Sequence, residues 1–313
     1  MNPLFTIAIP VYNRLGYIEE AVESVVSQTE TDFELVIVDN CSNDGTWEYL
    51  KQLSDERIRV FRNEQNIGMV FNWRKCIEYA NGKWFKFLMS DDIMLPGAIK
   101  ATRDIIENNP QIFVIISAGI GFRDSFTNKL KKQYEYSSEA EIERLSVLSV
   151  QKMAYDGKIL PCTPNAYAVL TKDLNKLVES TEYKIVEKDL GDTGHDVDFF
   201  ILYWILLKYS EVVLSKTPLY AVRCHSGNGS KKYLSDITYR FSGDCLTRRL
   251  LFPEFSLNRR KKFLFVTRIY FEILLVFLKD IIKRRENTIN IFKSTGQYLC
   301  VIIKIMSGAN FSG

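Results

Sequence analysis

Two adjacent carboxylates, Asp91 and Asp92, are the residues of this 313-residue chain whose types and spacing point most directly to chemistry. They follow an apolar run at 87–89, and such a like-charged pair ionises fully only beside a compensating cation. Hard divalent ions such as Mg²⁺ or Mn²⁺ take oxygen ligands from one or two carboxylates plus substrate phosphates. The pair therefore predicts a metal site, while a solvated Asp pair capping the helix predicted from Pro96 is the structural alternative.

A second acidic group lies at residues 194–200 (GHDVDFF), where Asp196 and Asp198 precede an apolar stretch. A positioned carboxylate can take the proton of an attacking hydroxyl, which makes Asp196 a candidate general base. Alternatively, Asp196 caps the helix predicted over 196–208, and Asp198 adds a favourable charge to its first turn. His195 at this helix start fits a structural role better than a catalytic one.

Polar loops follow the predicted strands 4–9 and 33–38. Tyr12 can stack on a base, and Asp39 can accept hydrogen bonds from a base N–H or from ribose hydroxyls. The alternative is an Asx-rich turn over 39–44 that caps the helix predicted over 45–53. Both roles can coexist in one loop.

Residues 220–231 (YAVRCHSGNGSK) form a basic segment that contains glycines. Arg223 and Lys231 offer positive charge, and His225 offers a contact to a metal or a phosphate. Gly227 and Gly229 give the backbone freedom to fold over a ligand. A plain flexible turn is the alternative.

Four motifs together resemble the inverting family-two glycosyltransferases of the GT-A fold. They are residues 9–14 (IPVYNR), 34–46 (ELVIVDNCSNDGT), 66–68 (NIG) and 90–92 (SDD). The resemblance is strong over 4–100, weaker from 160 to 231 and absent beyond. It implies that a sugar moves with inversion from a nucleotide-diphosphate sugar to an acceptor hydroxyl.

The resemblance also implies roles for single residues. Those expected to bind the donor are Pro10, Tyr12, Asn13, Asp39, Asn66, Asp91 and Arg223. Asp92 and His225 are expected to hold Mn²⁺ or Mg²⁺, which stabilises the charge on the leaving diphosphate, and Asp196 is expected to be the general base. Many relatives have Asp where this chain has Met89, which weakens the expectation of a metal modestly. Arg74 either faces the diphosphate or solvates its helix.

Other functional classes explain less of the pattern. A metal-dependent nucleotidyltransferase also places a carboxylate pair beside a nucleotide, but it gives no reason for the acidic helix start at Asp196. The non-enzymatic alternative is a degenerate transferase-like domain that serves as a binding or scaffold module. A dinucleotide-binding oxidoreductase is excluded because residues 119–121 (GIG) lack the third glycine, and no GxxxxGK[ST] loop indicates an NTPase.

Alternating apolar and amphipathic stretches must position these residues. Strands are predicted over 4–9, 33–38, 58–61, 83–88 and 112–117, and helices over 17–27, 45–53, 69–80 and 96–108. This rhythm predicts an α/β fold: a GT-A-like, doubly wound, mostly parallel sheet flanked by helices, with the polar loops at one crevice. Residues 124–158 are weakly patterned, and Thr163–Leu170 suggests a further strand.

The predicted organisation is a catalytic domain over 1–231, followed by a helical, basic, amphipathic region over 232–313. Within the domain, 1–100 is the nucleotide-binding half and 101–231 the acceptor half with the closing loop. Residues 248–313 hold thirteen Lys or Arg against four Asp or Glu. For residues 259–306 the open choices are a membrane surface, the core or another subunit of an oligomer. Charges within this apolar segment favour lying on a membrane over crossing it.

Composition is that of a folded protein, with 46% hydrophobic and 25% charged residues and no low-complexity tract. Six widely spaced cysteines without a CxxC argue against a disulfide framework and a structural zinc site. We therefore expect a cytoplasmic protein, peripheral on the membrane if the tail binds lipid. The tail and the resemblance motivate a saccharide or lipid-linked saccharide acceptor in surface polysaccharide synthesis, and we expect no nucleic-acid partner.

Overall fold

The computed structural model describes residues 2–123, 126–136, 139–150, 163–181, 183–184, 187 and 197–225. The chain divides into two compact units, Met1–Asn228 and Gly229–Gly313. The second unit, which holds the whole of the predicted helical tail, lies outside the described residues, as do Asp196 and residues 226–228. Among the described residues, no helix is long and apolar enough to cross a membrane.

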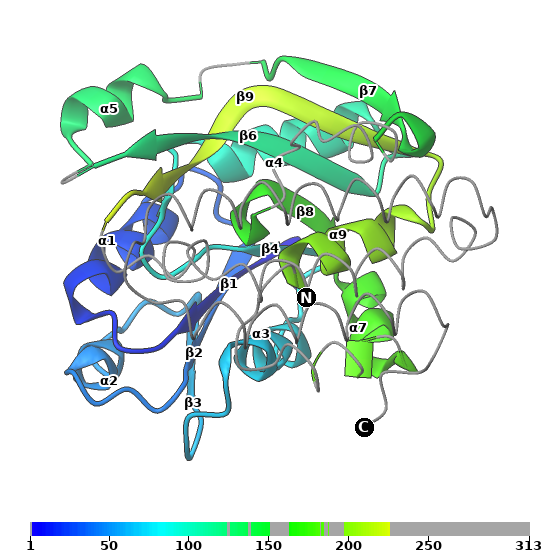
Figure 1. Ribbon diagram of the computed structural model, residues 1–313. Helices are drawn as coiled ribbons and strands as arrows, with labels where there is room; N and C mark the ends of the chain where they lie inside the picture. The colour runs from blue at the N-terminus through cyan, green and yellow to red at the C-terminus, as the bar shows by residue number, and fades with distance from the viewer. Residues whose placement is uncertain are drawn as a thin grey trace, which may run out of the picture. The chain divides into compact units, whose positions relative to one another are not determined.

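The first half of the unit Met1–Asn228 is a parallel sheet with intervening helices (Figure 1). Its strands are β1 (Phe5–Val11), β2 (Phe33–Asp39), β3 (Ile58–Arg62) and β4 (Trp84–Phe87), in the order β3-β2-β1-β4. Its helices are α1 (Leu15–Val26), α2 (Thr46–Leu50), α3 (Met69–Glu78) and α4 (Ala98–Asn108). β1 and β2 are buried along their whole length, as expected for parallel strands with both faces covered. The predicted α/β rhythm of this half is confirmed.

The register of β1 and β2 sets where their loops lie. The two strands pair from Phe5 opposite Phe33 to Val11 opposite Asp39. Both strands therefore end at the same edge of the sheet, which brings the loop after Val11 beside the loop after Asp39. This is the edge at which the sequence places the crevice.

The second half extends the sheet with strands of mixed direction. These strands are β5 (Ile93–Met94), β6 (Val114–Phe122), β7 (Ile142–Ser146), β8 (Tyr167–Leu170) and β9 (Glu211–Arg223). β8 joins β4 to β6 in antiparallel pairing, and β9 runs parallel to β6 while β5 and β7 pair antiparallel with β9. The short helices and turns are α5 (Asn128–Gln133), η1 (Pro164–Ala166), α7 (Thr171–Glu179) and α9 (Val197–Leu206).

Strand β9 corrects one expectation. Residues 220–223 were predicted to belong to a flexible loop, yet they form the end of β9 and pair with β6. The polar residues 215–218 hide the strand in the sequence, because they interrupt its apolar alternation where the register with β6 shifts. The predicted loop can therefore begin only after Arg223.

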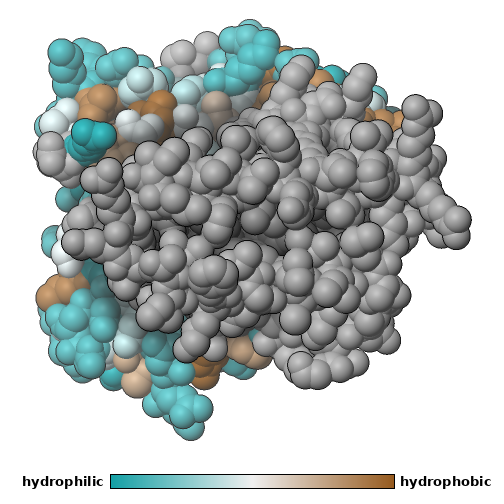
Figure 2. Space-filling view, viewed as in Figure 1, coloured by the Kyte–Doolittle hydropathy of each residue, from teal (hydrophilic) through white to brown (hydrophobic). Residues whose placement is uncertain are grey.

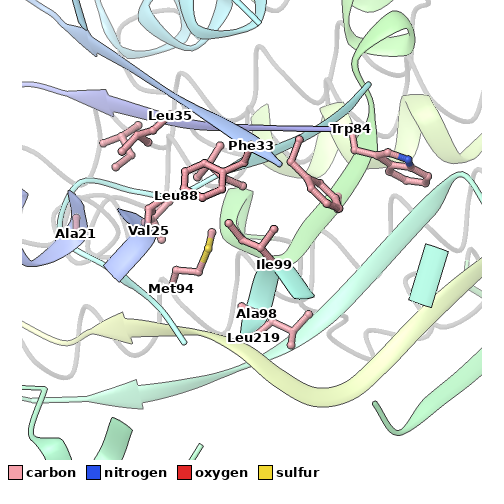
Figure 3. Close-up of a cluster of buried hydrophobic side chains, with 14 of the residues drawn as sticks. Ala21, Val25, Phe33, Leu35, Trp84, Leu88, Met94, Ala98, Ile99 and Leu219 are labelled. Atoms are coloured by element: carbon pink, nitrogen blue, oxygen red, sulfur yellow. The ribbon is translucent and has the colours of Figure 1, made fainter. Parts of the chain in front are cut away.

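One buried apolar cluster connects the two halves (Figure 3). It includes Val25 of α1, Leu35 of β2, Trp84 of β4, Met94 of β5 and Leu219 of β9. Each large side chain buried here contributes about 1.5–3 kcal/mol relative to exposure. The cluster fixes the position of β9 relative to the parallel strands, and hence the relative position of their carboxyl ends.

The described surface carries few large apolar side chains. Figure 2 shows its visible part as mainly hydrophilic, with isolated hydrophobic residues. The exposed large hydrophobic residues are Tyr12, Leu15, Met69, Leu148 and Leu207. Tyr12 is the one that follows β1 at the carboxyl edge of the sheet, where an exposed ring is available to a ligand.

Candidate functional site

The loops after β1 and β2 are joined through Asn13. Its backbone has φ = +50°, a left-handed conformation that Asn tolerates better than most residues. The Asn13 N–H donates to Ser42 Oγ at 2.9 Å, and its Oδ1 accepts from the Asn43 N–H at 2.9 Å. Pro10 is buried within β1, whereas Tyr12 is 42% exposed at the same loop. Of these three residues, Tyr12 offers the surface for a ligand.

Asp39 is fully buried and has partners within the protein. Its carboxylate accepts from the Ser42 N–H at 3.1 Å and forms an ion pair with Arg62 Nε at 3.3 Å. The predicted turn is therefore present, but α2 has Gly45 at its N-cap and no side-chain cap hydrogen bond. Arg62 was not singled out from the sequence, although it follows the predicted strand 58–61 at the carboxyl edge of the sheet. Its side chain is 35% exposed, so Arg62 presents a polar group where Asp39 does not.

Asn66 belongs to a network of asparagines. Asn40 Nδ2 donates to Asn66 Oδ1 at 2.8 Å, and Asn63 Nδ2 donates to Asn40 Oδ1 at 3.0 Å. Asn66 Oδ1 also accepts from the Gly68 N–H, where Gly68 has φ = +86°. Asn66 thus shapes the loop that leads from β3 to α3 and holds it against the loop after β2.

Asp92 is buried, with 4% exposure, and both of its carboxylate oxygens accept hydrogen bonds. Oδ1 accepts from the Arg223 N–H at 2.9 Å, and Oδ2 accepts from the side-chain amide of Asn165. Burial, and secondarily the charge of Asp91, raise the pKa of Asp92 to about 7 despite these hydrogen bonds. Asp92 therefore faces the interior, between η1 and β9.

Asp91 faces the other way, toward the loop that follows β9. Its Oδ2 lies 3.0 Å from His225 Nε2 and 3.7 Å from Arg14 Nε. The Asp91 and His225 side chains are 15% and 14% exposed, and the His225 ring lies 4.7 Å from the ring of Tyr17. The structure thus brings together an acidic residue and a histidine that are separated by 134 positions.

Arg223 supports this arrangement from below the surface, with 4% exposure. Its Nε donates to the main-chain oxygen of Asp91 at 3.1 Å, and its Nη2 forms an ion pair with Glu20 at 2.7 Å. The guanidinium also lies over the rings of Phe122 and Tyr17, at 4.6 and 5.2 Å from their centroids. These contacts of Arg223 connect α1, β6 and the turn at Asp91.

Of two further candidates from the sequence, Arg74 and Asp196, the structure describes only Arg74. Arg74 forms ion pairs with Glu78 at 2.8 Å and with Glu187 at 3.1 Å, so its guanidinium ties α3 to the segment after α7. Asp196 lies outside the described residues, and α9 begins at the next residue, Val197. In the described part of the chain, no group of three or more His, Cys, Asp or Glu is arranged to hold a metal.

Comparisons with known proteins agree with the fold. Residues 6–178 match the family described as glycosyl transferase family 2. The chain is 31% identical over 217 residues to the uncharacterized glycosyltransferase MJ1057 of Methanocaldococcus jannaschii, a match that covers 66% of this chain and 71% of that protein. It is 44% identical over 93 residues to the putative teichuronic acid biosynthesis glycosyltransferase TuaG of Bacillus subtilis, covering 29% of this chain and 37% of TuaG.

Crystal structures of TarS from S. aureus have a similar fold. One aligns with a TM-score of 0.54 at 18% identity, covering 83% of this chain and 45% of the TarS chain. A second, TarS 1–349 in complex with UDP-GlcNAc, aligns with a TM-score of 0.54 at 17% identity, covering 82% of this chain and 74% of that one. The family match over more than half of the chain and the shared fold lead to one conclusion: this protein belongs to glycosyl transferase family 2 and has the GT-A fold.

Proposed function

We propose that this protein transfers a sugar, with inversion, from a nucleotide-diphosphate sugar to an acceptor hydroxyl. The observation that carries the proposal is the Asp91–His225 pair at 3.0 Å, located at the edge of the sheet where β1 and β2 also end. Family membership supports glycosyl transfer. A TarS structure of similar fold is a complex with UDP-GlcNAc, which supports a nucleotide-sugar donor.

Asp91 and His225 are the residues that fit a divalent metal. The sequence-based hypothesis assigns Asp92 and His225, but both Asp92 oxygens already accept buried hydrogen bonds. The Asp91 carboxylate and the His225 imidazole, 3.0 Å apart, would hold such an ion together with oxygens of the donor diphosphate. Bound Mn²⁺ or Mg²⁺ supplies positive charge to the leaving diphosphate.

The other side chains divide the remaining tasks. Tyr12 stacks on the nucleobase, and Arg14, with 31% of its side chain exposed beside Asp91, offers its charge to the diphosphate. Asp196, directly before α9, accepts the proton of the acceptor hydroxyl as that oxygen bonds to the anomeric carbon. The bond from the anomeric carbon to the diphosphate breaks in the same step, so no covalent enzyme intermediate forms.

The acceptor is a saccharide or a lipid-linked saccharide in surface polysaccharide synthesis. The similarity to TuaG, a putative teichuronic acid biosynthesis glycosyltransferase, supports this class over 29% of the chain. The basic segment 259–306, outside the described residues, is proposed to bring the enzyme to the membrane surface that carries such lipids. Analysis of the reaction product distinguishes sugar transfer from nucleotidyl transfer, and its anomeric configuration tests inversion.

The deciding experiment removes the proposed metal ligand. A thermal-shift screen of nucleotide sugars with Mn²⁺ identifies the donor, and Asp91→Asn then lowers Mn²⁺-dependent transfer by about 100-fold, since a group that stabilises the leaving charge is lost. Glu107→Gln, at an exposed carboxylate of α4, is the matched control and retains wild-type activity. Unchanged transfer by Asp91→Asn, or full activity in EDTA, contradicts the metal site.

A further inference from the structure

Two segments that are distant in the sequence form hydrogen bonds with the turn that carries Asp91. Asp92 accepts one hydrogen bond from Asn165 in η1 and one from the Arg223 N–H at the end of β9. These partners lie 73 and 131 positions away from Asp92. A single buried carboxylate therefore joins the turn after β4 to both η1 and β9.

Asn165 bonds to the same turn at a second point. It is 1% exposed, and its Oδ1 accepts from the Met89 N–H at 2.7 Å while its Nδ2 donates to Asp92 Oδ2. The main-chain oxygen of Asn165 accepts from the buried Nζ of Lys86 in β4. All polar groups of the Asn165 side chain thus have partners in the turn, and its backbone has one in β4.

These contacts enclose Asp91. The Asp92 N–H donates to the Met89 oxygen at 3.0 Å, which closes the turn on itself. Asn165 holds both ends of this turn, and Arg223 Nε bonds the main-chain oxygen of Asp91 between them. The position of the Asp91 carboxylate relative to His225 follows from the same contacts, because His225 is two residues beyond Arg223.

We propose that Asp92 and Asn165 form a buried positioning pair, which directs Asp91 toward His225 without touching the donor. The functional part of this inference rests on the site proposed above. Asn suits position 165 because its amide offers both a donor for Asp92 and an acceptor for the Met89 N–H, which neither an ionised Asp nor an aliphatic residue supplies.

A reciprocal exchange tests the pair. In Asp92→Asn, two amide NH₂ groups face each other, and in Asn165→Asp, two carboxylates do. In the double variant, the amide at 92 donates to the carboxylate at 165. The oxygen at 92 still accepts from the Arg223 N–H, and the second oxygen at 165 accepts from the Met89 N–H. The exchange therefore restores every hydrogen bond of the pair while it removes the carboxylate at 92.

Affinity for UDP in the presence of Mn²⁺, measured by calorimetry on the full chain, is the main readout. We expect each single variant to bind about tenfold more weakly and the double variant to bind within about threefold of wild type. The matched control is Asn109→Asp, a buried asparagine remote from the turn that pairs with Arg144, and it retains wild-type affinity. A double variant as weak as Asp92→Asn means that Asp92 itself contacts metal or donor, and overturns the proposal. Single variants that bind like wild type overturn it as well.

Thermal unfolding without ligand separates this inference from the proposed function. The single variants are expected to unfold at lower temperature than wild type, and the double variant to recover most of the loss. If wild-type protein binds no nucleoside diphosphate with Mn²⁺, the proposed function fails, and the unfolding series still decides whether the pair exists. Absence of recovery in the double variant contradicts the pair in either case.

Discussion

The two sides of the candidate site are built in different ways. On the side of β1, β2 and β3, the bonds Asn13–Ser42, Asn40–Asn66 and Asn40–Asn63 join residues 29, 26 and 23 positions apart. On the side of β4 and β9, Asp91–His225 and Glu20–Arg223 join residues 134 and 203 positions apart. After the roles proposed above, we call these the nucleoside side and the metal side.

This difference implies that a substitution can disrupt one side of the site and leave the other intact. Loops after neighbouring parallel strands meet at one edge as soon as those strands pair, so the nucleoside side needs only the first half of the sheet. The metal side forms only when η1 and β9 are in place. We therefore expect changes on the nucleoside side to weaken binding with or without metal, and changes on the metal side to act only on metal-dependent binding.

Asp39→Asn gives the largest effect expected on the nucleoside side. It breaks the ion pair with Arg62 while it keeps an acceptor for the Ser42 N–H, so Arg62 is held only by its hydrogen bond to the Ser42 oxygen and its contact with the Trp47 ring. UDP affinity falls by about tenfold or more, equally with Mn²⁺ and with EDTA. The control Asp55→Asn breaks a partly exposed pair with Arg57 and leaves affinity unchanged. A loss confined to the Mn²⁺ condition breaks the comparison.

Lys86→Met tests the support of the metal side through pH. Burial lowers the pKa of Lys86 from 10.5 to about 7. Between these values the unfolded chain binds a proton that the folded chain does not, so folding stability rises with pH from about 7 toward 10, by on the order of 1 kcal/mol per pH unit. The variant lacks this rise in chemical denaturation at pH 7–9.5.

The window for that measurement avoids Asp92. Its raised pKa of about 7 means that the folded state holds the extra proton between about pH 4 and 7, so its contribution falls as pH rises there and is constant above. Lys83→Met, at an exposed lysine just before β4, is the control and keeps the wild-type slope. Equal slopes for wild type and Lys86→Met show that Lys86 is charged in the folded protein at these pH values.

Asn13→Ala gives the smallest effect. It places alanine, which tolerates the left-handed region less well than asparagine, at φ = +50° and removes the acceptor for the Asn43 N–H, which costs about 1–2 kcal/mol of stability and a few-fold in metal-free UDP affinity. Asn13→Gly relieves the backbone but not the lost hydrogen bond, so it recovers part of the stability. Thermal unfolding of both variants separates the two terms, and an identical loss in both assigns the whole effect to the hydrogen bond.

The sequence predicts the first half of the sheet well for a physical reason. Buried parallel strands require continuous apolar runs, and the helices between them require amphipathic ones, so residues 5–108 show both patterns clearly. β5 and β7 are too short or too exposed to show such a pattern, and residues 215–218 interrupt that of β9. In the mixed half, the sequence therefore predicted strands at the places of β6 and β8, but not β5, β7 or β9.

From the sequence, the candidate site could be predicted only as a set of residue types, without their arrangement in space. The acidic pair and His225 were found from the sequence, and the structure brings Asp91 and His225 together. Which of the two carboxylates faces His225 depends on Asn165 and Arg223. Their contacts with the turn join residues that lie more than 70 positions apart in the sequence. The roles of Asp196 and of the basic tail stay predictions, because these residues lie outside the part of the chain that the structure describes.

Strand β9 pairs with three other strands and ends two residues before His225. Since a strand advances about 3.3 Å per residue, the length of β9 sets how far along the sheet His225 lies. Loss of one residue within 215–218 shifts the histidine by one such step away from Asp91 while the nucleoside side is untouched. Residues far from any ligand thus offer evolution a way to switch off transfer and keep nucleotide binding.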